Sequence, residues 1–346
     1  MKSHRPAPTR FSRFAAVAVC LAVALCTVLC VAAGYRIGFR VGHGGAGRGP
    51  QPDRMVFQVK GASMTPTLVE GDLCLVQPPA SALAIGDVVA IDWAGKARIK
   101  RIAALAGDRL EVREGHLLVN QQRLEDLLAA RDDSAFPLRP ALVPVASGPT
   151  DWRRPHPTSP WLVFCYANPH SGGHPTAVMD DYPSNTDVHR RLRPVDRLVL
   201  EVTPEADGRW PSASDEGRVA FFQSGNLAVA PIPISIGSRR ISQRAAREST
   251  RNDGSDLEAG ALSISRPIAL RVSPQVASEL QLRVWREIEY RADTASSTVA
   301  YPLTVPEGKM FVVGDNVPVS VDSRQWGNIP TNAVTGQAVC TIDPRE

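Results

Sequence analysis

The longest apolar stretch of the chain runs from Phe14 to Tyr35, 22 residues without a charge. This exceeds the roughly 20 residues that a helix needs to cross a bilayer. A cleavable signal peptide is the alternative, because Val31–Ala33 resembles a cleavage site, but the apolar core of such a peptide is usually about 7–15 residues long. We therefore expect an uncleaved transmembrane helix over residues 14–35, preceded by a cytoplasmic N-terminus over residues 1–13.

Basic residues flank this apolar stretch on both sides. Four precede it and three follow it: Lys2, Arg5, Arg10, Arg13, and then Arg36, Arg40, Arg48. Because positive charge is enriched on the cytoplasmic side of membrane helices, the pattern favours a cytoplasmic N-terminus and places most of the chain outside the cytoplasm. The stretch Gly42–Pro52, rich in glycine and proline, predicts a flexible linker over residues 36–53.

From Met55 onwards the pattern changes to short apolar runs bounded by Gly, Asp or Pro. These runs predict six strands: Val56–Lys60, Leu73–Gln77, Val88–Trp93, Arg98–Leu105, Arg109–Arg113 and His116–Asn120. Glu114-Gly115 forms a plausible hairpin turn between the last two. Short strands at this spacing are typical of a β-barrel or a β-sandwich.

A second series of strands follows a looser, proline-rich stretch and a short helix predicted over Leu124–Arg131. The predicted strands are Trp161–Ala167, Arg197–Thr203, Arg218–Phe222, Leu227–Ala230, Leu262–Ser265, Ile268–Val272 and Leu280–Tyr290. The polar, basic segment Arg239–Gly254 is the predicted disordered loop of this region. From residue 299 the sequence again shows short apolar runs bounded by Gly, Asp or Pro, like those of its first strands.

The predicted fold is therefore mainly β, with an N-terminal transmembrane helix and a β-barrel or sandwich core that a large β-rich subdomain interrupts. The first part of the core covers residues 54–120, the inserted subdomain covers 121–298, and the second part of the core covers 299–346.

Composition limits the classes of function. A formal net charge of +4 over 346 residues is modest, and the sequence holds no zinc-finger spacing or helix-turn-helix, so we expect no nucleic-acid partner. Three of the six cysteines lie in the apolar stretch. The other three are Cys74, Cys165 and Cys340, an odd number that indicates no disulfide framework, although a Cys74–Cys340 bridge is possible in an oxidising compartment.

Lysine is rare in this chain. Of 39 Lys and Arg residues only five are lysine, and Lys100 is one of them. A lysine can lose its proton when it is buried, whereas a guanidinium stays charged, so a lysine among arginines suggests a base. Ser63 lies 37 residues earlier, and a Ser-Lys pair can activate a hydroxyl nucleophile without histidine.

Three segments carry the remaining candidate chemistry of the chain. The first is Gly61-Ala62-Ser63-Met64-Thr65-Pro66, the second is Ile99-Lys100-Arg101-Ile102 with Gly107-Asp108, and the third is Gly314-Asp315-Asn316 with Ser320, Asp322-Ser323-Arg324 and Trp326-Gly327. Taken together and in this order, they resemble bacterial type I signal peptidases. The resemblance covers the apolar stretch and about 120 residues of the predicted core, but not the insert.

The resemblance implies a role for each matching residue. Ser63 is the nucleophile, Lys100 is the general base, and Ser320 hydrogen-bonds the Lys100 amine and aims it at Ser63. Asp322 and Arg324 form an ion pair that supports the wall of the active site. Gly314 and Asp315 also have a structural role there. The residues themselves agree with this assignment, because the apolar neighbours Ile99 and Ile102 would desolvate Lys100 and depress its pKa from about 10.4.

The substrate side of the site is less clearly marked. The backbone N–H of Ser63 would help to stabilise an oxyanion. Many Gram-negative members carry a serine two residues before the nucleophile, but this chain has Gly61, as in many Gram-positive members, so a second donor would be backbone or absent. Met64 and the strand around Val88–Ile91 are candidate walls of the pockets for the small substrate residues before the cut.

The expected function is a membrane-anchored endopeptidase that cleaves signal peptides from exported preproteins after small residues, on the extracytoplasmic side of the membrane. Its expected partners are preprotein signal peptides and the lipid bilayer, and no metal or organic cofactor is needed. Cys165, His170, His174 and Asp180 can be drawn as a metal site, but their turn-rich setting disfavours it. The alternatives are a pilin-maturation peptidase of a conjugation system and an inactive membrane-tethered binding protein.

Overall fold

The computed structural model describes residues 54–342 apart from short gaps. The gaps are 80–81, 132–136, 146–150, 169–171, 183–184, 186–187, 189–190, 205–216, 224–225, 233–238, 249–256, 259 and 294–297. Apart from the first residues of β1, all the elements below belong to the compact unit Phe57–Glu346. The chain in this unit is mainly β, and its neighbouring strands pair antiparallel.

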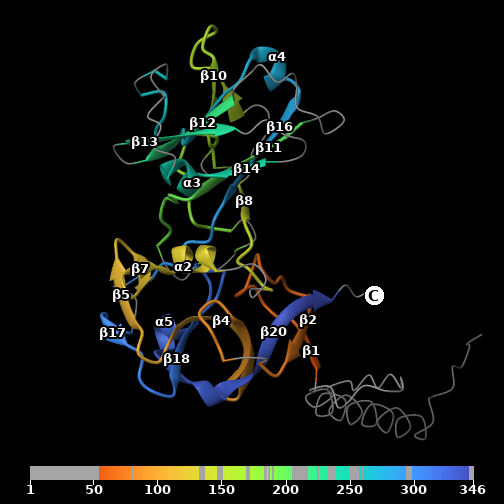
Figure 1. Cartoon of the computed structure of the whole chain (residues 1–346), viewed down its shortest axis with the longest axis vertical. Coiled ribbons are helices and arrows are strands. Elements are labelled where there is room, and N and C mark those ends of the chain that lie inside the picture. Colours follow the sequence, from red (N-terminus) through yellow and green to blue (C-terminus); the bar gives the residue numbers. More distant parts are fainter. Residues whose placement is uncertain are drawn as a thin grey trace, which may run out of the picture. The chain divides into compact units, whose positions relative to one another are not determined.

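The largest sheet has seven strands in the order β1-β2-β20-β3-β4-β18-β19. Their bounds are Met55–Gln58 (β1), Leu73–Gln77 (β2), Val334–Ile342 (β20), Val88–Trp93 (β3), Lys96–Leu105 (β4), Lys309–Val313 (β18) and Ile329–Pro330 (β19). The sheet is strongly curved, and β4, β18 and β20 surround a common centre in Figure 1. Strands from the beginning and the end of the chain thus build one sheet, as the returning sequence pattern predicted.

A four-stranded sheet packs against this one. Its order is β17-β5-β6-β7, with bounds Leu303–Thr304, Arg109–Arg113, His116–Val119 and Gln122–Arg123. The hairpin between β5 and β6 turns at Glu114 and Gly115, whose φ angles of 53° and 84° fit the positive values that a two-residue hairpin turn requires. The helix α2 (Leu124–Ala130) follows β7 and buries Leu124 and Leu128, so the predicted short helix is confirmed.

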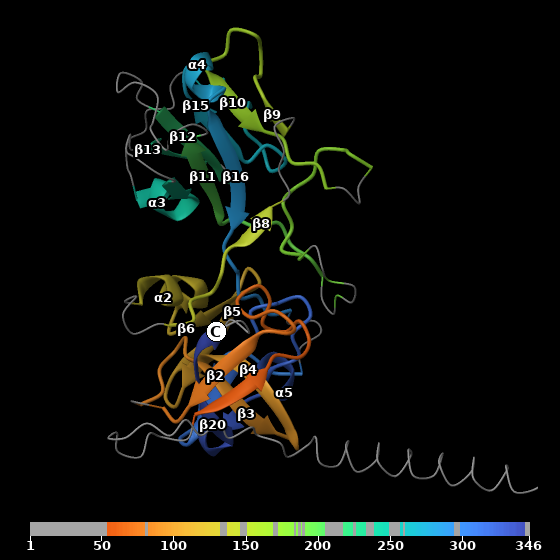
Figure 2. The same ribbon diagram turned by 90° about the vertical axis from the view of Figure 1, so that its right-hand side faces the viewer.

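The remaining strands form two sheets that share one hydrophobic core. The first has the order β13-β12-β15-β10-β9 (Asn226–Ile232, Gly217–Gln223, Ile268–Arg271, Trp161–Phe164, Trp152–Arg153). The second has the order β14-β11-β16-β8 (Arg239–Ser242, Leu198–Pro204, Leu280–Arg286, Val143–Val145). Figure 2 shows strands of the two sheets side by side. Phe164, Phe221 and Ile268 of the first sheet pack with Leu200 and Val284 of the second, as a sandwich requires.

Two sequence predictions in this region are wrong. Arg239–Gly254 was expected to be a disordered loop, but it begins with β14 and the helix α3 (Gln243–Glu248), because Ile241 and Ala246 bury against the sandwich core. Leu262–Ser265 was expected to be a strand, but its backbone makes only an isolated bridge from Ser263 to Arg266. The strands of the sandwich lie between residues 143 and 286, inside the predicted insert.

The short helices complete the described elements. They are α4 (Pro274–Ala277), α5 (Ser323–Trp326) and the 3-10 turn η4 (Thr331–Ala333). Within the described residues, every helix is too short or too polar to span a bilayer. The predicted transmembrane helix over 14–35 and the predicted linker over 36–53 lie outside the described residues.

The three described cysteines are free thiols. Cys74 is buried on β2, and Cys340 is exposed on β20, where it pairs in register with Leu75. Burial raises the pKa of the Cys74 thiol to about 11, with smaller contributions from Cys340 and Asp72. The possible Cys74–Cys340 bridge is therefore not formed in this structure.

Candidate active site

The fold brings Ser63 and Lys100 into direct contact. Lys100 projects from β4 and is 2% exposed, and Ser63 lies half-buried in the turn that precedes β2. The Nζ atom of Lys100 donates a hydrogen bond to the Oγ atom of Ser63 at 2.7 Å. A base within this distance of a hydroxyl is positioned to take its proton.

The surroundings of Lys100 favour its neutral form. Val89 lies directly across from it on β3, and Ile102 follows two residues later on β4; both are fully buried. Burial lowers the pKa of Lys100 from 10.5 to about 8. Asp322 and Asp315 act in the opposite direction, while Arg324 and Arg98 lower the pKa further.

Ser63 belongs to a short turn held by its own backbone. Thr65 N–H donates to the Ala62 carbonyl at 3.1 Å, and Leu68 N–H donates to the Met64 carbonyl at 3.0 Å. Gly61 has a φ of +76°, and a Cβ added there would meet no atom within 4 Å, so its backbone conformation, not crowding, favours glycine. None of the described residues accepts from Ser63 N–H, which leaves this donor available.

The ion pair between Asp322 and Arg324 is present and buried. Arg324 Nη2 lies 2.5 Å from Asp322 Oδ2, with 5% and 0% of the two side chains exposed. Asp322 also caps α5, because its side chain accepts from Arg324 N–H at 3.1 Å, and it accepts from Gly314 N–H at 2.8 Å. The carboxylate thus joins the end of β18 to the start of α5.

Ser320 makes a different contact from the expected one. Its hydroxyl donates to Asp322 Oδ2 at 2.7 Å, while the side-chain amine of Lys100 is hydrogen-bonded, within the described residues, to Ser63. An ionised carboxylate is a stronger acceptor than a neutral amine, so the Ser320 proton goes to Asp322. The structure therefore does not contain the expected bond from Ser320 to Lys100, although Ser320 is buried beside the same carboxylate that faces the amine.

A second buried ion pair lies beside the first, and the sequence analysis gave its arginine no role. Arg101, the residue after Lys100, donates to Asp315 from Nε at 2.8 Å and from Nη2 at 2.5 Å, and both side chains are fully buried. Asp315 also accepts from the hydroxyl of Thr67, four residues after Ser63. This pair connects the three segments of the site, and the adjacency of Arg101 to Lys100 was the signal that could have suggested it.

A family model matches the two parts of the chain that carry these residues. The family model described as signal peptidase, peptidase S26, matches residues 54–150 and 243–342, more than half of the chain. The chain belongs to this family. Residues 151–242, which the match leaves out, contain β9 to β14 of the sandwich.

One curated relative shows a shorter similarity. Mitochondrial ATP-independent inner membrane protease subunit 1a of Arabidopsis thaliana is 30% identical over 59 residues, which are 17% of this chain and 35% of that protein. The matched region thus spans about a third of that relative's length.

The residues expected to face substrate lie together in this S26 peptidase family member. Met64 is 1% exposed and packs in one cluster with Val88 and Ala90 of β3, with Ile99 of β4 against it. Because side chains alternate along a strand, Ile99 lies on the opposite face of β4 from Lys100. Gly61 is exposed at the start of the same turn.

The described residues offer one cluster of three side chains with metal-ligand chemistry. His116, Asp196 and Glu289 place one ligand atom each within 4.8 Å of one another. However, Arg123 donates to Asp196 at 3.1 Å and Arg291 donates to Glu289 at 2.9 Å, so both carboxylates are already neutralised. We assign the cluster to structural ion pairing, and Cys165, His174 and Asp180 do not form a group with it or with each other; His170 is outside the described residues.

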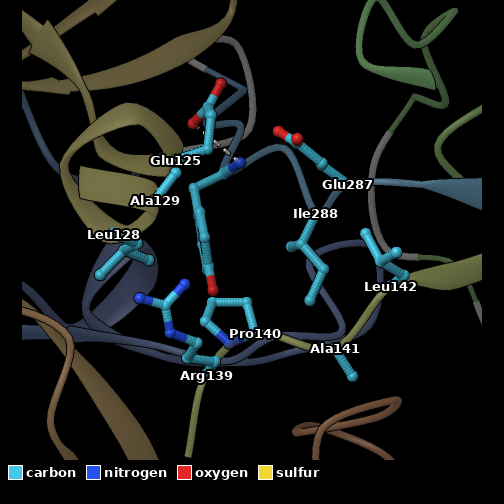
Figure 3. Close-up of a pocket in the computed structure, with 10 residues that line it drawn as sticks. Glu125, Leu128, Ala129, Arg139, Pro140, Ala141, Leu142, Glu287 and Ile288 are labelled. Atoms are coloured by element: carbon cyan, nitrogen blue, oxygen red, sulfur yellow. Dashed lines mark hydrogen bonds between the residues drawn. The ribbon is translucent and has the colours of Figure 1, made fainter. Parts of the chain in front are cut away.

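A cavity of about 140 Å³ lies between α2 and the segment after β16, away from the dyad. Leu128, Pro140 and Ile288 surround it, and Glu125 and Glu287 lie at its edge (Figure 3). Ser63, Lys100 and Ser320 are not among its lining residues, so the cavity is not the site of peptide cleavage.

Asp322→Ala should destabilise the protein strongly. The substitution leaves the Arg324 guanidinium buried without its carboxylate, and removing one partner of such a pair typically costs about 3–5 kcal/mol. Urea unfolding of the purified variant measures this loss, with Glu111→Ala as the control, because Glu111 pairs with the exposed Arg109. A loss of similar size in both variants would contradict the structural role of Asp322.

Proposed function

We propose that this protein is a membrane-anchored serine endopeptidase that removes signal peptides from exported preproteins after small residues, with Ser63 and Lys100 as its catalytic dyad. The observation that carries the proposal is the 2.7 Å contact between Lys100 Nζ and Ser63 Oγ, with the lysine buried and its pKa lowered to about 8. Membership of the signal peptidase family supports the reaction class.

The reaction proceeds in two stages. Neutral Lys100 takes the Ser63 proton while Oγ attacks the scissile carbonyl carbon, and the Ser63 N–H stabilises the oxyanion. The Lys100 ammonium then gives the proton to the leaving amine nitrogen as the C–N bond breaks. In the second stage Lys100 takes a proton from water, the hydroxide attacks the acyl carbon, and the proton returns to Ser63 Oγ as the signal peptide leaves as a carboxylic acid.

The substrate binds as an extended strand. Main-chain hydrogen bonds give affinity in this mode, and pockets select alternate side chains. The cluster of Met64, Val88, Ala90 and Ile99 includes the residue after Ser63, and it is the candidate apolar wall for the small residues before the cut. The apolar stretch 14–35 and the name of the relative, an inner membrane protease, support membrane anchoring. The four basic residues before this stretch, against three after it, favour a catalytic domain on the extracytoplasmic side.

Cleavage of a defined preprotein tests this proposal. The full chain in detergent or liposomes is expected to release a signal peptide from a preprotein with Ala at the –1 and –3 positions, and to leave intact the same preprotein with bulky residues there. Ser63→Ala is the matched negative control. If the wild type cleaves no preprotein and cannot be distinguished from the Ser63→Ala control, the enzyme hypothesis is wrong and the protein is a binding protein instead.

The rate should depend on pH through Lys100. Because only the neutral amine acts as base, kcat/KM is expected to rise with pH through an apparent pKa of about 8 and to fall about tenfold per unit below it. The measurement is kcat/KM from pH 6 to 10 with a substrate that has no titrating group near the cut. A profile that is flat from pH 6 to 9 would contradict a lysine base.

A further inference from the structure

The main chain of Ser63 is held by a turn from the second part of the core. We use the name catalytic turn for this segment, Gly314–Asn316, which follows β18 directly. Asn316 N–H donates to the Ser63 carbonyl at 3.1 Å, and Ser320 N–H donates to the Asn316 carbonyl at 2.9 Å. The position of this turn therefore fixes the main chain of the nucleophile.

Three side chains from outside the two core segments hold the catalytic turn. Tyr182 donates its hydroxyl to the Asp315 carbonyl oxygen at 2.7 Å, and Tyr290 donates its hydroxyl to Asp315 Oδ1 at 2.8 Å. Asn185 exchanges two hydrogen bonds with the Asn316 amide, at 2.8 and 3.0 Å. The two tyrosines are 3% and 1% exposed, so these hydrogen bonds are shielded from solvent.

These three residues are themselves fixed by the insert. Tyr182 and Asn185 lie between β10 and β11, and Tyr290 follows β16. The guanidinium of Arg286, the last residue of β16, lies 4.6 Å from the centre of the Tyr182 ring and donates to the Asp181 carbonyl at 2.5 Å. Tyr290 N–H donates to Glu125 Oε2 of α2 at 3.4 Å.

The core alone does not satisfy the catalytic turn. Arg101 and Thr67 fill part of the hydrogen-bonding capacity of the Asp315 side chain, but the Asp315 carbonyl and the Asn316 amide depend on Tyr182 and Asn185. A buried acceptor without its donor costs free energy, and the turn would move to recover a partner. Movement of the turn would shift Ser63 against Lys100.

We propose that the inserted subdomain is part of the catalytic machinery, with Tyr182, Asn185 and Tyr290 as positioning residues that hold the catalytic turn and through it Ser63. This inference rests on the proposed Ser63–Lys100 peptidase. None of the three residues acts on the substrate in this mechanism; each acts through Asp315 or Asn316.

The test compares Tyr182→Phe, Tyr290→Phe and Asn185→Ala with Tyr301→Phe. Among the described residues, the buried hydroxyl oxygen of Tyr301 has no hydrogen-bond partner, so the control removes the same atom without breaking a hydrogen bond. Each of the three variants is expected to lower kcat about tenfold with KM unchanged, because misplacing a reacting group by a fraction of an ångström is costly. Tyr301→Phe is expected to keep the wild-type kcat.

A second measurement reports whether the catalytic turn is held in place, independently of catalytic activity and of global stability. Amide hydrogen exchange of Asn316 and Ser320, followed by mass spectrometry, should accelerate in the three variants and not in Tyr301→Phe, at temperatures well below unfolding. The double variant Tyr182→Phe/Tyr290→Phe should lose less than the product of the two single losses, because both act through Asp315.

The outcomes are distinct. Wild-type kcat and exchange in all three variants overturn the inference, and so does a rise in KM at constant kcat, which indicates substrate contact instead. If the wild-type protein cleaves no preprotein, the proposed function is wrong. Faster amide exchange in the variants would in that case still show that the three residues of the insert keep the catalytic turn in place.

Discussion

Lys100→Arg is expected to abolish cleavage as completely as Ser63→Ala. Arginine keeps the positive charge but does not deprotonate in proteins, so Ser63 would lose its base while the site keeps a cation of similar length. Both variants should reduce kcat/KM by at least roughly 10³-fold, because a dyad acts as a unit and loses almost all its effect when either member is removed. Cleavage of the Ala-containing preprotein measures the loss.

Lys96→Arg is the matched control for this substitution. Lys96 is exposed at the start of β4, the strand that carries Lys100, so the same chemical change is made four residues away without reaching the site. The control should retain wild-type activity. Full activity in Lys100→Arg would refute the general-base role and leave the 2.7 Å contact as a structural hydrogen bond.

Ser320→Ala should have a smaller effect than either dyad variant. The resemblance suggested that this hydroxyl orients Lys100, but it donates to Asp322 instead. Asp322 retains Gly314 N–H and Arg324 as partners when Ser320 is lost, so the carboxylate stays in place. The role of this hydroxyl therefore depends on the acceptors around it, which the sequence motif alone does not reveal.

Strands that appear as short apolar runs bounded by Gly, Asp or Pro were predictable from the sequence. Leu73–Gln77, Val88–Trp93 and Arg109–Arg113 agree with β2, β3 and β5 to the residue. Errors arose where tertiary contacts decide the structure. The polar run at Arg239 becomes β14 because it pairs with β11, which no local pattern indicates.

The site shows the same division. Ser63, Lys100, Asp322 and Arg324 were predictable because short motifs carry them. Tyr182 and Asn185 were not, since they lie more than 130 positions away from Asp315 and Asn316 in the chain and no pattern near them marks a contact. Their role depends on the way the insert folds back onto the core.

Gly314→Ala is expected to remove most of the activity, by at least roughly 100-fold. A Cβ at position 314 would overlap the carbonyl oxygen of Ser63 and the hydroxyl of Ser320, and it would lie 2.6 Å from Ser320 Cβ. The Ser63 oxygen belongs to the main chain and cannot rotate away. The nucleophile must therefore shift away from Lys100, and kcat measured in the preprotein assay should report that shift.

Gly336→Ala separates this effect from the general cost of crowding. A Cβ there would lie 2.5 Å from Val76 Cγ1 and 3.0 Å from the Gln77 carbonyl oxygen, between β20 and β2 and away from the dyad. This control should lose stability but keep the kcat of the folded fraction. The double variant Gly314→Ala/Ser320→Ala should stay inactive, because removing the Ser320 hydroxyl leaves the overlap with the Ser63 carbonyl oxygen and the close contact with the Cβ atom of residue 320. If the double variant regained activity, the collision with the Ser320 hydroxyl alone would account for the loss, and the close approach of Gly314 to the nucleophile would not be the reason that position 314 requires glycine.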